Sequence, residues 1–117
     1  MTKGFYLTDE EKRVICDFIF LPLARRVLEN DLNVIKTSNL KFKSVYCSLI
    51  EKALQKLSCD LRDVRKAILK LNIKPIYEDT LCYKVICRGW HHHVQIHDMI
   101  AAQQVQRKVN YYITGAG

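Results

Sequence analysis

Histidine and cysteine side chains in the second half of the chain are the first candidates for metal binding or nucleophilic chemistry. Residues 91–93 are three consecutive histidines, His97 follows them, and Cys82 and Cys87 precede them. Imidazole and thiolate groups are ligands of Zn²⁺, and a thiol beside an imidazole can act as a nucleophile. Whether these groups converge depends on the secondary structure that carries them.

Alternating residues on either side of Gly89-Trp90 predict a β-hairpin with strands at about 81–88 and 91–97. Glycine at the first position of a two-residue loop is typical of a type II′ turn, and this loop sets Arg88 opposite His91. One face of the hairpin is then mainly apolar and the other mainly polar. The pairs on the apolar face are Cys87 with His92, Val85 with Val94, and Tyr83 with Ile96. Residues 73–77 are a candidate third strand.

This register separates the potential metal ligands. His92 points away from His91 and His93, and His97 lies about 13 Å further along the strand, at about 3.3 Å per residue. Cys82 pairs with His97, far from the histidine run. His91 and His93 therefore form a two-ligand site at most, whereas structural zinc takes four ligands. We expect no native metal site and no cofactor.

Catalytic signatures are also weak. Cys87 and His92 face each other in this register, but both lie on the face that the pattern buries, which favours a small core cysteine. No glycine occurs between Gly4 and Gly89, which excludes a glycine-rich phosphate loop or a G-x-S-x-G elbow there. We expect the protein not to be an enzyme.

Positive charge is concentrated in the middle of the chain. The net charge is +7, and residues 36–74, with ten Lys and Arg against three Asp and Glu, carry all of that excess. Residues 1–35 sum to −1 and residues 75–117 to +1. Basic residues gathered on one element favour a phosphate-binding surface, although a solvated Lys-rich helix face gives the same pattern.

Helical periodicity accounts for most of the remaining sequence. Thr8-Asp-Glu-Glu11 has the form of a capping box, and the helix after it should be kinked or divided at Pro22 and stop at Asn30-Asp31, before a short extended segment at 33–37. A second helix is predicted at about 41–57, with a break at Ser58-Cys59-Asp60 that caps a third helix over 60–71. A last helix is predicted over 98–114, ending at Gly115.

The order helix, short extended segment, helix, turn, helix and hairpin resembles that of a winged helix–turn–helix domain over residues 8–97. The fold class is then α+β, mainly helical with a β-hairpin. In this arrangement residues 60–71 form the recognition helix and the hairpin tip forms the wing. The DNA-binding residues would be Arg62, Arg65, Lys66, Lys70, Lys74, Arg88 and Trp90.

The whole chain, residues 1–117, is predicted to be one domain. Its composition is globular, no apolar run reaches the roughly 20 residues of a membrane span, and five scattered cysteines suggest buried thiols in the cytoplasm. The expected function is binding of double-stranded DNA in transcription regulation, with a homodimer formed through residues 98–114. The alternative is a small adaptor or inhibitor whose basic helices bind an acidic protein partner.

Overall fold

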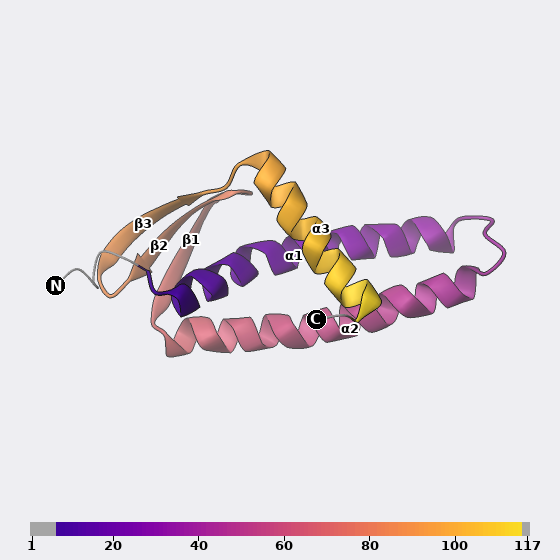
Figure 1. The fold of residues 1–117 in the computed structure, drawn as a ribbon, viewed down its shortest axis with the longest axis horizontal. Helices are drawn as coiled ribbons and strands as arrows, with labels where there is room; N and C mark the ends of the chain where they lie inside the picture. The colour runs from indigo at the N-terminus through magenta and orange to yellow at the C-terminus, as the bar shows by residue number, and fades with distance from the viewer. Residues whose placement is uncertain (1–6, 116–117) are drawn as a thin grey trace.

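Two long antiparallel helices form the body of the protein, with a small sheet at one end and a third helix crossing them (Figure 1). This computed structural model describes residues 7–115 and measures 60 × 25 × 20 Å. The predicted α+β class is confirmed, with three helices and a three-stranded antiparallel sheet. The elements are α1 (Asp9–Lys36), α2 (Lys43–Lys70), β1 (Ile73–Asp79), β2 (Cys82–Cys87), β3 (Trp90–Gln95) and α3 (Asp98–Thr114).

Helix α1 begins at the predicted capping box but does not divide. The Thr8 hydroxyl accepts from the Glu11 amide, and the Glu11 carboxylate accepts from the Thr8 amide. The helix then continues through Pro22 to Lys36, so the predicted stop at residues 30–31 and the extended segment at 33–37 are wrong. Buried Leu21, Ala24, Leu28 and Leu32 continue the apolar face past the proline. Their packing offsets the roughly 3 kcal/mol that an interior proline costs.

Helix α2 is one continuous helix, so the predicted break at residues 58–60 is wrong. Its buried stripe crosses this segment without a change of phase, because Leu57 and Leu61 are one turn apart and both are buried. Ser and Asp are only mildly unfavourable inside a helix, too little to interrupt such a face. The described residues therefore contain no helix–turn–helix, and the winged-helix order is not formed.

The sheet has the order β1-β2-β3, which confirms both the hairpin and the third strand. The loop, however, is Arg88-Gly89 rather than Gly89-Trp90, and both loop residues have positive φ, as in a type I′ turn. Cys87 consequently pairs with Trp90, and Val85 with His92. The observed register is shifted by two residues from the predicted one. Each side chain therefore stays on its predicted face of the sheet, but each residue has a different cross-strand partner.

Helix α3 ends at Gly115, as predicted, and packs on its own domain. Ala101 and Tyr112 are buried, and Val105, Val109 and Ile113 pack partly against the core. Most of the stripe considered for a dimer interface therefore contacts α1 and α2 instead. The apolar core itself lies between the three helices and the inner face of the sheet, where Ile73, Val85 and Cys87 are buried.

The cysteines are less buried than expected. Only Cys87 is buried, whereas Cys16 and Cys59 are exposed and Cys47 and Cys82 are intermediate. The prediction of small buried thiols is wrong for the two exposed residues, because they lie on the outward sides of α1 and α2. No helix within residues 7–115 is both long and apolar enough to cross a membrane.

Candidate functional site

The outward face of α2 carries a row of exposed basic side chains. Arg62, Lys66 and Lys70 follow one another at one-turn spacing. Lys52 lies five turns before Lys70 on the same side, a distance of about 27 Å at 1.5 Å per residue. We call this surface the basic face of α2; its centre is Lys52, Arg62, Lys66 and Lys70. The exposed residues Lys56 and Arg65 form its two opposite flanks, because they are nine residues, or two and a half turns, apart.

These charges are poorly neutralised within the protein. Among residues 7–115, the salt bridges involve Arg25, Arg88, His93 and Lys108, so no residue of the basic face of α2 takes part in one. Lys56 instead lies over the Tyr111 ring, 4.6 Å from its centroid. The basic face is therefore available to an anionic partner.

The other residues predicted to bind DNA are placed differently. Lys74 lies on the solvent side of β1, opposite Ile86, and is exposed. Trp90 pairs with Cys87 beside the turn and is 41% exposed. The guanidinium of Arg88 is bound to Glu11, so this side chain holds the hairpin to α1 rather than extending as a wing.

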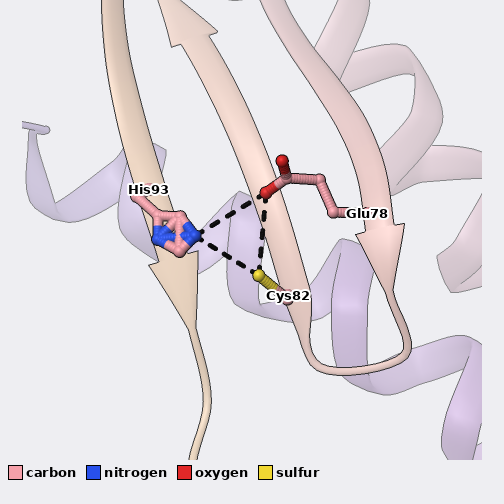
Figure 2. Close-up of side chains that lie close together, drawn as sticks. All are labelled: Glu78, Cys82 and His93. Carbon is pink, nitrogen blue, oxygen red and sulfur yellow. Dashed lines mark hydrogen bonds and ion pairs between the residues drawn. The ribbon is translucent and has the colours of Figure 1, made fainter.

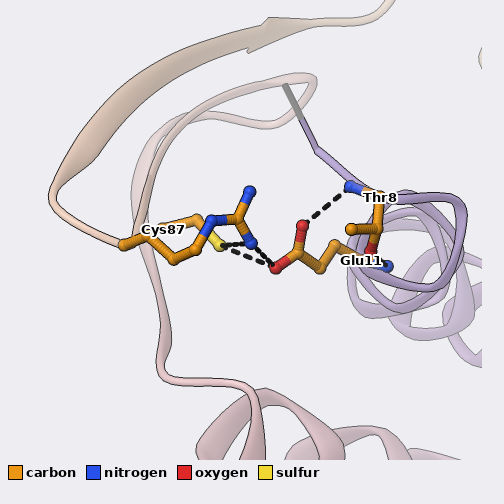
Figure 3. A network of polar contacts seen from close by, with 4 residues as sticks. Thr8, Glu11 and Cys87 are labelled. Carbon is orange, nitrogen blue, oxygen red and sulfur yellow. Dashed lines mark hydrogen bonds and ion pairs between the residues drawn. The ribbon is translucent and has the colours of Figure 1, made fainter. Parts of the chain in front are cut away.

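Glu11 joins the start of α1 to the β2–β3 turn (Figure 3). One carboxylate oxygen accepts from the Thr8 amide at 2.7 Å, and the other accepts from the Cys87 thiol at 3.1 Å and from Arg88. Burial would raise the pKa of Glu11, but these three donors outweigh it and hold the pKa below 4.5. Burial and the Glu11 carboxylate in turn raise the pKa of the Cys87 thiol, which is unlike a catalytic cysteine.

The thiol–imidazole pair of Cys87 and His92 does not form. His92 pairs with Val85, and its Nε2 atom is buried without a hydrogen-bond partner among the described residues. The Cys87 thiol contacts Glu11 and Arg88 instead. This arrangement gives no support to nucleophilic catalysis by Cys87.

A cluster that the sequence did not predict lies on the outer face of the sheet, where each strand contributes one side chain (Figure 2). The Cys82 sulfur is 3.3 Å from His93 Nε2 and 3.6 Å from Glu78 Oε1. His93 Nε2 is also 3.6 Å from that carboxylate oxygen, so the three atoms form a closed triangle. Partial desolvation and the neighbouring carboxylates of Glu78 and Asp79 raise the pKa of the Cys82 thiol.

Two features of the sheet create this cluster. A bulge between Tyr77 and Asp79 leaves Glu78 as an extra residue beside Cys82. The observed register pairs Lys84 with His93, so that His93 lies diagonally across from Cys82. The predicted register had instead paired Cys82 with His97 and treated Glu78 as a turn residue. Only the alternation of residues along the two strands could have placed Cys82 and His93 on one face.

A pocket of about 550 Å³, lined by both polar and apolar side chains, lies where α3 crosses α1 and α2. Two pairs line it: Lys108 donates to Asp17 at 2.7 Å, and the Tyr112 hydroxyl donates to Asp60 at 2.6 Å. Burial and this bond to Asp60 raise the pKa of Tyr112. In each pair the carboxylate of α1 or α2 accepts a hydrogen bond from a side chain of α3. The two pairs therefore fasten α3 to α1 and α2.

Comparison with known proteins places the chain in a family. Residues 6–117 match the family described as YhjD protein, and the chain belongs to that family. A relative from Bacillus subtilis (strain 168), named "Uncharacterized protein YhjD", is 29% identical over 99 residues, which cover 81% of this chain and 82% of the relative. No solved structure matches. These names state no activity.

Proposed function

We propose that the protein binds double-stranded nucleic acid through the basic face of α2. The observation that carries this proposal is that six exposed Lys and Arg side chains lie on one continuous helix, four of them on its outward face, without a salt bridge among the described residues. A row about 27 Å long spans roughly eight base pairs of duplex at 3.4 Å per pair. Such a row suits a series of phosphates.

The mode of binding differs from the one that the sequence predicted. Because residues 7–115 contain no helix–turn–helix, they present no short recognition helix to a major groove, and Arg88 is engaged by Glu11. Contacts from Lys and Arg to phosphates position a protein on a duplex but carry no sequence information. We therefore propose backbone binding that is independent of base sequence.

Charge reversal tests this proposal. Replacing Arg65 and Lys66 with Glu should abolish binding of a random duplex, and the fold should survive because both side chains are exposed. For the wild type, log affinity should fall linearly with log salt, with a slope of about −4 to −5 for four to six phosphate contacts. Fluorescence anisotropy at several salt concentrations measures both quantities.

The matched control is reversal of Arg25 and Arg26, an adjacent and exposed pair on α1. It changes net charge by the same amount but lies outside the basic face of α2, and so should weaken binding far less. Equal losses in the two double variants would show that net charge alone matters. Absence of duplex binding by the wild type at low salt would refute the proposal.

A second candidate is an adaptor that binds an acidic protein, and the loop end of the helical hairpin favours it. Exposed apolar side chains gather there beside Lys36, Lys41 and Lys43; they are Leu40, Phe42, Val45, Tyr46 and Leu49. Exposed apolar clusters with a charged rim commonly mark protein interfaces. An adaptor would bind its partner through Phe42 and Val45, and Phe42→Ser would weaken that complex without affecting duplex binding.

A further inference from the structure

Glu78, Cys82 and His93 have the donor types of a transition-metal site. Thiolate, imidazole and carboxylate are the three ligand classes that Zn²⁺ takes from proteins. Two anionic ligands and one neutral ligand also balance the charge of a divalent ion. Within residues 7–115, these residues form the one group of three or more His, Cys, Asp or Glu whose donor atoms lie within 4.8 Å of one another.

The spacing of the three donor atoms matches tetrahedral coordination. Bonds of about 2.3 Å to sulfur and about 2.0 Å to nitrogen and oxygen, at tetrahedral angles, put the donor atoms about 3.3–3.5 Å apart. The separations in the protein are 3.3, 3.6 and 3.6 Å. A chain of hydrogen bonds would need only two of these contacts to be short, whereas an ion bound by all three groups requires the closed triangle.

The surroundings leave room for an ion. His93 and Glu78 have side chains that are 59% and 45% exposed, and the outer face of the sheet is not covered by a helix in the described structure. Figure 2 shows the three side chains converging above the strands from β1, β2 and β3. An ion there can be reached from solvent and keeps one coordination position open to water.

We propose that Glu78, Cys82 and His93 bind one Zn²⁺ ion through Oε1, Sγ and Nε2, with water as the fourth ligand. On binding, the Cys82 thiol releases its proton to solvent and the thiolate bonds to the metal. The ion then links all three strands at the end of the sheet that leads into α3. This site is independent of the basic face of α2.

Titration of the untagged, reduced, full-length protein with Zn²⁺ and Co²⁺ tests the site. One Zn²⁺ per chain should bind in competition with a chromophoric chelator, and the melting temperature should rise with Zn²⁺ concentration. Co²⁺ should give a thiolate-to-metal charge-transfer band. Because second-shell changes already weaken binding by about 10- to 100-fold, loss of a ligand in Glu78→Gln, Cys82→Ser or His93→Gln should weaken Zn²⁺ binding by more than about 100-fold.

Two controls separate this site from adventitious binding. His91→Gln removes the neighbouring histidine on the same face of β3, and Cys59→Ser removes an exposed thiol on α2. Both should leave Zn²⁺ affinity unchanged. Equal weakening by His91→Gln and His93→Gln would show that the histidine run alone binds metal and would overturn the proposal. A wild-type protein that lacks the charge-transfer band with Co²⁺ would overturn it as well.

Discussion

The two ends of the α1–α2 hairpin differ in what covers them. At the sheet end, the Phe18 ring packs edge-on against Tyr83, and Glu11 binds the β2–β3 turn. At the loop end, Figure 1 shows the two helices extending beyond both α3 and the sheet. Apolar side chains such as Phe42 and Val45 are there 59% and 53% exposed.

This difference shows that helical periodicity alone does not decide burial. Leu49 and Leu57 belong to the same helix and are eight residues apart, yet Leu49 is 46% exposed and Leu57 is fully buried. Ile50, one residue after Leu49, is 6% exposed, so the residues that lose cover toward the loop end are those beside the seam between α1 and α2 rather than those within it. We infer that the sheet end and the α3 crossing add most to the stability of the helical pair, whereas the loop end leaves apolar side chains exposed.

The largest effect should come from truncating a leucine in the covered region. Leu57→Ala should lower the free energy of unfolding by about 2–5 kcal/mol, because it leaves a cavity in packed core. Leu49→Ala, the matched change at the loop end, should cost less than about 0.5 kcal/mol. Chemical denaturation measures both. Similar losses of unfolding free energy in the two variants would show that the loop end is as well packed as the middle of the α1–α2 pair.

A smaller effect is expected at the junction between α1 and the sheet. Glu11→Gln keeps the shape of the side chain but removes the charge that Arg88 and Cys87 contact, and should cost about 1.5–3 kcal/mol at neutral pH. Glu10→Gln, at an exposed position one residue earlier, should change stability little. Thermal or chemical denaturation of the two variants gives the comparison.

The pH dependence of this junction has a defined sign. The pKa of Glu11 in the folded protein is lowered from 4.5, so its contribution is fully present above that pH. As the pH falls through the lowered pKa, the carboxylate is protonated and the contribution disappears. The stability difference between the wild type and Glu11→Gln should therefore shrink below about pH 4.5. A difference that grew on acidification would contradict the assigned role of Glu11.

Local signals in the sequence predicted the local features of the fold. The capping box, the position of α3 with Gly115 after it, the third strand and the buried side of the hairpin are all found in the structure. Residues 30–31 and 58–60 were misread as helix ends, and Pro22, which was expected to kink or divide α1, does not divide it. Packing between α1 and α2 outweighs these local preferences. The contact between α1 and α2, which cannot be seen within either segment alone, determines that both helices continue without a break.

The sites were predictable to a lesser extent. Charge distribution correctly gathered Arg62, Arg65, Lys66 and Lys70 on one helix, and whether they bind nucleic acid stays a prediction. The turn was misplaced because Arg88 adopts φ of 53°, a conformation unusual for a residue with a side chain. Its pairing with Glu11, 77 residues away in sequence, helps to hold that conformation. One misplaced residue in the turn was enough to hide the proximity of Cys82 and His93.

The smallest of these effects tests how α3 covers the middle of the hairpin. The Tyr112 hydroxyl donates a 2.6 Å hydrogen bond to Asp60, so Tyr112→Phe removes the bond while keeping the buried ring. Asp60 is only half-buried and can turn to water. The expected loss of unfolding free energy is therefore near the low end for a bond to a charged group, about 1.5 kcal/mol.

Tyr111→Phe is the control, since among the described residues that ring contacts Lys56 and Tyr112 through its face and edge rather than through its hydroxyl. Hydrogen exchange should show faster opening of α3 in Tyr112→Phe, with α2 beyond the crossing unaffected. Equal exchange in both variants would mean that apolar packing alone holds α3, and the boundary between the covered and uncovered regions would then rest on Ala101 and Val105 instead of on this polar pair.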